Sequence, residues 1–209
     1  MNILMQSQNA SRKVLNLLEA NARESQICVQ ILVANIGKPD PCLILEHFSD
    51  AYRSACQANE SATEEIYRTY FAHLQNKDIE SLAKALRAIP PASRTFSRKS
   101  FLLASHFDQS ELSMQTSLLQ RISDTTTEMI VSFCRRNNLD AMIANRKNLK
   151  LLEEEADKLT HDRITRVLKN NMDQEKTILM LSLYSSIREL IDVCLNAGNS
   201  AFEIHLRYA

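Results

Sequence analysis

Apolar residues recur every three or four positions along most of the chain, which is the spacing of one face of an α-helix. The first stripe predicts a helix over residues 11–36, and the second predicts a longer helix from residue 41 to about residue 75. Gly37 and Pro39 lie between them, as is typical of a helix end. Asp40 followed by Pro41 is typical of a helix start. The chain therefore begins with two long helices joined by a short connection.

The third stripe begins near Asn76 and Asp78, both of which can cap a helix. It then meets two consecutive prolines, Pro90 and Pro91. Each proline removes a backbone donor and clashes with the preceding helical turn, so we expect either a kink or a complete break. The apolar positions of this element are Ile79, Leu82, Leu86, Ile89, Phe96, Phe101 and Leu103.

Three further stripes follow, and Asp108, Asp140 and Asp173 lie at their starts. The pairs Asn137–Asn138 and Asn170–Asn171 mark the two breaks between them. Gly198 lies on the apolar face of the last helix, where a missing side chain lets a neighbour come close. The positions expected to face inward are Met114, Leu118, Ile122, Met129, Phe133, Leu149, Leu152, Ala156, Leu159, Val167, Met180, Tyr184, Ile187, Ile191, Cys194 and Ala201.

Composition agrees with long helices and few connections. Among 209 residues there are only 2 glycines and 4 prolines, too few for the closely spaced turns of a sheet protein. The middle helices of the two sets also carry similar acidic segments, 60–66 and 153–159. The sequence therefore predicts a single all-α domain of six long helices, arranged as two three-helix repeats over about residues 9–105 and 109–207.

Charge and cysteine content argue against a nucleic-acid-binding or membrane-inserted protein and favour a reducing compartment. The chain has 25 basic and 25 acidic residues, which argues against bulk attraction to nucleic acid or to an acidic membrane. The densest basic run, Arg94–Lys99, is short and interrupted by Phe96, and we interpret it as a solvated helix face. The longest nearly apolar run, Ile178–Leu183, is far too short to insert into a membrane. Five cysteines without a C-x-x-C pair predict reduced thiols and a cytoplasmic location.

Paired carboxylates are the main candidates for chemistry. Glu153 and Asp157 lie four residues apart, so both fall on one face of the fifth helix, at the edge of its apolar stripe. Asp192 on the last helix can reach the same region, and Glu60 and Glu64 form the corresponding pair in the first repeat. Carboxylates from adjacent helices are ligands for hard cations. A solvated charged face is the alternative reading, since such runs most often serve solubility.

Sequence signatures of enzymes are missing. No glutamate is followed three residues later by histidine, so the E-x-x-H di-iron pattern does not occur. Neither does H-E-x-x-H, a phosphate-binding loop or a nucleophile elbow. We therefore expect a protein that is not an enzyme.

The two three-helix sets, each with an acidic motif in its middle helix, resemble the PhoU-like family. The closer resemblance is to the PhoU relatives often encoded beside Pit-type phosphate transporters. It is carried by E-x-x-x-D followed by an aliphatic residue at Glu153, Asp157 and Leu159, by KDIESLAKAL at 77–86, and by IRELID at 187–192. The resemblance implies an elongated helical bundle and multinuclear sites for a divalent or ferric ion, whose identity the sequence leaves open.

This chain departs from the family pattern at several ligand positions. The third helix has LRAIPP at 86–91 where the family often has acids, and Glu64 replaces an aspartate. Arg188 stands where a glutamate is usual, while Asp192 remains. If the family's metal sites carry over, both therefore have fewer ligands here. Arg188 also supplies the positive charge that a metal would have supplied.

The resemblance implies a non-enzymatic regulator or accessory protein of inorganic phosphate transport. Such a protein acts by contact with a Pit-type transporter or a signalling protein, at the cytoplasmic side of the membrane. The alternative is a helical scaffold or adaptor unrelated to phosphate. The sequence leaves open whether the chain forms a homo-oligomer.

Overall fold

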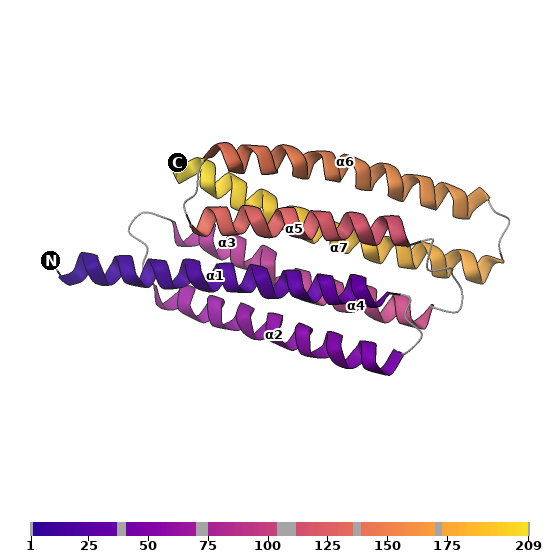
Figure 1. Ribbon diagram of the computed structural model, residues 1–209, viewed down its shortest axis with the longest axis horizontal. Coiled ribbons are helices and arrows are strands. Elements are labelled where there is room, and N and C mark those ends of the chain that lie inside the picture. Colours follow the sequence, from indigo (N-terminus) through magenta and orange to yellow (C-terminus); the bar gives the residue numbers. More distant parts are fainter. Residues whose placement is uncertain are drawn as a thin grey trace.

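The apolar stripes form helices that lie side by side along one long axis (Figure 1). The computed structural model describes residues 2–36, 41–69, 75–103, 112–135, 139–169 and 173–208. Every regular element in these ranges is helical, so the all-α prediction is confirmed. None of these helices is long and apolar enough to cross a lipid bilayer. They are α1 (Asn2–Asn35), α2 (Pro41–Arg68), α3 (Asn76–Arg87), α4 (Ile89–Leu102), α5 (Ser113–Cys134), α6 (Leu139–Lys169) and α7 (Gln174–Tyr208).

Two helix limits differ from the sequence prediction. The first helix begins at Asn2 rather than near residue 11, because neither glycine nor proline precedes Ser11 to stop it. The second ends at Arg68, earlier than expected. The predicted helix signals at Gly37, Pro39, Asp40, Asp108, Asn137–Asn138 and Asn170–Asn171 lie outside the described residues.

The predicted third helix is split in two at Ala88. Pro90 and Pro91 have no backbone N–H, so neither can donate a hydrogen bond to the carbonyl four residues before it. A proline also disfavours helical backbone angles at the residue that precedes it. The N–H of Ala88 instead donates to the carbonyl of Ala85 at 3.2 Å, which closes the last turn of α3. Both prolines then fall in the first turn of α4, where a missing donor costs little.

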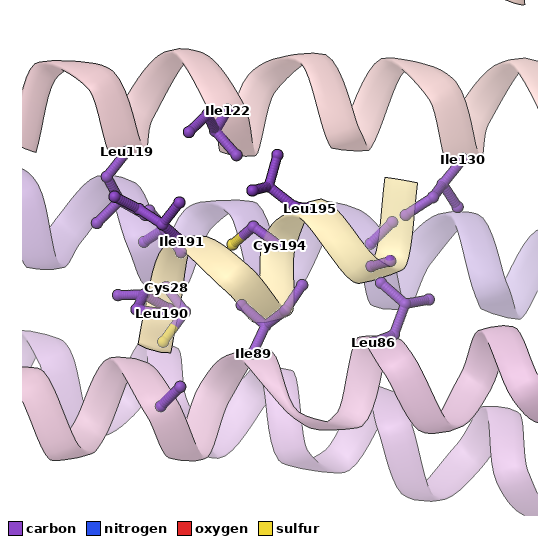
Figure 2. Close-up of a cluster of buried hydrophobic side chains, with 14 of the residues drawn as sticks. Cys28, Leu86, Ile89, Leu119, Ile122, Ile130, Leu190, Ile191, Cys194 and Leu195 are labelled. Carbon is purple, nitrogen blue, oxygen red and sulfur yellow. The ribbon is translucent and has the colours of Figure 1, made fainter. Parts of the chain in front are cut away.

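Helix α7 packs against four neighbours, α3, α4, α5 and α6. Helix α1 packs against α2, α3, α4 and α5, so the two sets of helices meet through α1, α3, α4, α5 and α7. Figure 2 shows Cys194 and Leu195 of α7 among side chains of α3, α4 and α5. The division into two repeats, 9–105 and 109–207, stays a prediction.

Most positions predicted to face inward are buried, among them Leu118, Ile122 and Ile187. The prediction that Met114 faces inward is wrong, since 58% of its surface is exposed. Phe101 is also exposed, whereas Phe96 and Leu103 on the same helical segment are buried. Both exposed residues lie in the terminal turn of a helix: Phe101 in the last turn of α4 and Met114 in the first turn of α5.

Asp78 has a different role from the predicted helix cap. The cap position of α3 is Gln75, which makes no side-chain capping bond. The buried carboxylate of Asp78 accepts hydrogen bonds from Arg207 Nη1 at 2.6 Å and from Tyr208 Oη at 2.8 Å. Tyr208 Oη in turn accepts the N–H of Gln75 at 3.0 Å. The last turn of α7 is thereby tied to the first turn of α3.

The described cysteines are free thiols, as predicted. They are Cys28, Cys56, Cys134 and Cys194, while the side chain of Cys42 lies outside the described part of the chain. Loss of solvent on burial raises the pKa of Cys28, Cys134 and Cys194 to about 12. These three thiols therefore stay protonated at neutral pH and behave as small apolar side chains.

Gly198 permits the close approach of α5 and α6 to α7, and a larger residue there should destabilise the fold. A Cβ at this position would lie 2.8 Å from Leu149 Cδ2 and 3.2 Å from Thr126 Oγ1. We expect Gly198→Leu to lower the free energy of unfolding by about 1–3 kcal/mol through overpacking, after a gain in helix propensity of about 1 kcal/mol. Urea denaturation followed by circular dichroism measures the change.

The matched control is Asn196→Leu, which adds the same side chain to an exposed position of α7. This variant should unfold within about 0.5 kcal/mol of the parent protein. Equal unfolding free energies for Gly198→Leu and Asn196→Leu would contradict the packing described for α7.

Candidate site at the carboxylates of α6 and α7

Helices α6 and α7 bring three of the predicted site residues into one region. Leu152 and Ala156 are buried, so the residues that follow them, Glu153 and Asp157, lie at the edge of the core. Glu153 is half-buried and Asp157 is exposed. Asp192 comes from the adjacent α7 and lies close enough to share a partner with Asp157.

That partner is Arg188. Its Nη1 donates to Asp157 Oδ1 across the two helices, and its Nη2 donates to Asp192 Oδ1 at 2.9 Å, one turn along α7. The side chain of Arg188 is 25% exposed, whereas those of Asp157 and Asp192 are 61% and 47% exposed. One guanidinium therefore joins two carboxylates that both reach solvent.

The two carboxylates favour the ionised form of Arg188. Partial burial alone would lower the pKa of Arg188, but the hydrogen bonds and negative charges of Asp192 and Asp157 outweigh it and raise that pKa above its usual value. The guanidinium therefore carries its positive charge at neutral pH. Because the carboxylates are largely solvated, the pairs contribute at most about 1 kcal/mol each.

The cluster is chemically suited to linking α6 to α7. A hard cation needs several oxygen atoms that converge on one point, and Asp157 and Asp192 direct theirs to a guanidinium. Within the described ranges, no group of three or more His, Cys, Asp or Glu side chains is placed to hold a metal ion. Metal binding by Glu153, Asp157 and Asp192 stays a prediction.

The other predicted pair, Glu60 and Glu64, is remote from this cluster. Both side chains are exposed on α2, and Glu64 accepts from Arg68 at 3.5 Å on the same helix. Helix α2 contacts neither α6 nor α7, and the two acidic pairs lie on opposite sides of the bundle (Figure 1). Metal binding by Glu60 and Glu64 likewise stays a prediction.

Two further glutamates of the acidic segments, Glu65 and Glu155, also make ion pairs between helices. Glu65 accepts from Lys13 of α1 at 2.8 Å. Glu155 accepts from Arg121 of α5 at 3.2 and 3.0 Å through its two oxygens. Sequence spacing therefore identified both acidic segments, but it did not single out the two glutamates that pair with the first helix of each set.

Comparison with known proteins gives a likeness of fold. A scan against models of known protein families finds no match, and a search of curated proteins finds none either. Among solved structures, the chain is similar to a crystal structure from Shewanella oneidensis MR-1, described as a "putative PhoU-like phosphate regulatory protein". The TM-score is 0.66 at 13% identity, over 93% of this chain and 99% of that one. The chain therefore has a PhoU-like helical-bundle fold.

Removing the guanidinium tests what holds the carboxylate cluster together. Arg188→Gln leaves Asp157 and Asp192 without a shared cation, so we expect a loss of about 0.5–1.5 kcal/mol in unfolding free energy. If the carboxylates can also hold a metal, Mn²⁺ should raise the melting temperature of Arg188→Gln by more than it raises that of the parent. Differential scanning calorimetry with and without Mn²⁺ measures both effects.

Arg68→Gln is the matched control, because Arg68 pairs with a glutamate one turn away on α2 and both groups are exposed. It should change the unfolding free energy by less than about 0.5 kcal/mol. An Arg188→Gln protein as stable as Arg68→Gln, and indifferent to Mn²⁺, would show that the cluster neither links the helices nor holds an ion.

Proposed function

We propose that this protein is a non-enzymatic, PhoU-like regulator or accessory of inorganic phosphate transport that acts by contact with another protein. The observation that carries the proposal is the likeness of fold to the Shewanella phosphate regulatory protein, which extends over nearly all of both chains. The extent of the likeness matters, because short helical hairpins recur in unrelated proteins and a match to one hairpin alone says little about function. The resemblance of the acidic motifs to PhoU relatives encoded beside Pit-type transporters supports the choice of partner.

One end of the bundle supports action through contact. Large apolar side chains are exposed there in the last turns of α4 and α6, the first turn of α5 and the second turn of α7. Figure 1 shows these four helix termini toward the same end of the bundle. Single exposed apolar residues are common, but several at one end of a bundle are typical of a contact surface. We call this set the end surface: Phe101, Leu102, Met114, Leu168 and Ile178.

On this proposal the end surface meets the cytoplasmic side of a Pit-type phosphate transporter, and the protein is a cytoplasmic one bound peripherally at the membrane. The Arg188 cluster then has the structural task of keeping α6 and α7 in register below that surface. A divalent or ferric ion bound by the helix carboxylates would brace the same two helices. A self-associating protein would use the end surface to contact a second copy instead.

The test measures binding to the Pit-type transporter from the same genome, purified in detergent. We expect the chain to bind it and to alter the initial rate of radiolabelled phosphate uptake in cells that depend on this transporter. Leu168→Asp should weaken binding by about tenfold or more, because it places a charge in an apolar contact. Biolayer interferometry gives the affinities.

Tyr67→Asp serves as the control, because Tyr67 is equally accessible but lies near the end of α2, at the opposite end of the bundle. Its affinity should match that of the parent. If the chain neither binds the transporter nor alters uptake, the link to phosphate transport fails and the scaffold alternative takes its place. Light scattering of the same samples reports whether the end surface joins two copies.

A further inference from the structure

A groove between α2 and α4 lies apart from the carboxylate cluster. Its volume is about 480 Å³, which is within the usual range of small-molecule sites. It lies where these two helices pack against each other. Eight residues line it: Phe48, Ser49, Tyr52, Arg53 and Cys56 from α2, and Arg94, Ser97 and Arg98 from α4.

The rim of the groove is positively charged. Three of the eight lining residues are arginines and none is acidic, although the whole chain has no net charge. Guanidinium groups bind phosphate and carboxylate groups through paired, charge-assisted hydrogen bonds. An anion is therefore the complementary ligand.

The arginines are only weakly engaged within the protein. Arg53 pairs with Asp50 at 3.1 Å, but both side chains are about three-quarters exposed, so the pair is easily exchanged. Arg94 lies over the ring of Tyr52 at 5.1 Å from its centroid, and its Nη1 donates one long hydrogen bond, 3.5 Å, to the Tyr52 hydroxyl. Arg98 is exposed and makes no ion pair or hydrogen bond within the described part of the chain. Their donors remain available to a bound anion.

The wall of the groove is apolar and aromatic. Phe48 is almost fully buried, and its ring centroid lies 6.4 Å from that of Tyr52. Cys56 continues the same face of α2, because residues 48, 52 and 56 are each one turn apart. A flat ring can pack against such a wall while its charged substituent reaches the arginines.

We propose that this groove binds a nucleoside phosphate, with the base against Tyr52 and Cys56 and the phosphates between Arg53, Arg94 and Arg98. The anion accounts for the cationic rim, the flat base accounts for the aromatic wall, and a mononucleotide fits the volume. The proposal does not depend on a role in phosphate transport, because it rests on the lining residues alone.

Isothermal titration calorimetry of the full chain with ADP tests it. We expect one site per chain with a dissociation constant below about 1 mM, weakening as salt is added because the arginines are exposed. Adenosine lacks the phosphates and pyrophosphate lacks the base, so each should bind at least about tenfold more weakly than ADP.

Arg98→Ala should weaken ADP binding by at least about fivefold while leaving the melting temperature unchanged, because Arg98 has no described partner to lose. Arg166→Ala is the matched control: Arg166 is an exposed arginine of α6 without an ion pair among the described residues, on the far side of the bundle. It should bind ADP as the parent does.

Three results would overturn the proposal. The first is an absence of heat from ADP at millimolar concentration, which would leave an acidic peptide as the occupant to test. The second is equal weakening by Arg98→Ala and Arg166→Ala, which would indicate diffuse charge attraction. The third is pyrophosphate binding as tightly as ADP, which would remove the role of the aromatic wall.

Discussion

The burial of α7 on several sides is the constraint on which the rest of the structure depends. An isolated helix is marginal in water, so α7 is stable only because α3, α4, α5 and α6 cover its apolar surface. Each fully buried leucine or isoleucine, such as Leu190 and Ile191, contributes about 1.5–3 kcal/mol. Because α7 is in contact with four helices, only one rotation of α7 about its own axis places its apolar residues against all of them. That rotation directs Arg188 of α7 to Asp157 of α6.

Much of this fold follows from the sequence, because periodicity identifies the face of a helix that is buried. It does not reveal how completely the neighbours cover that face near a helix end, and Met114 and Phe101 are exposed although both lie on apolar stripes. The two consecutive prolines in the sequence indicate that the third helix is interrupted near residue 90. The break falls at Ala88 because the prolines cannot donate to the carbonyls of the residues four positions earlier. Those carbonyls belong to the last turn of α3, which therefore ends there.

The sites were less predictable, because contacts between helices depend on rotation and height together. Spacing along one helix is reliable, and it correctly placed Glu153 and Asp157 on one edge of α6. It could not select Glu155 over them as the partner of Arg121. The basic run 94–99 was interpreted as a solvated face because Phe96 interrupts it. In a helix that residue turns into the core, and Arg94 and Arg98 then share the face that borders α2.

Two arginine sites in this neutral chain differ in how much of their hydrogen-bonding capacity is used. Arg188 is shared by two carboxylates, so an incoming anion would have to displace both. Arg98 has no described partner, so a bound anion changes its energy most. Within the described residues, α4 alone contributes to both the groove and the end surface: Arg94 lies about two turns, and Arg98 about one turn, before Phe101 and Leu102. A ligand that draws these arginines toward α2 therefore acts on the helix that presents two of the apolar contact residues. On the two proposals together, α4 is the element through which a ligand in the groove would alter contact with a partner, because both sites bias the position of one short helix that begins at a break.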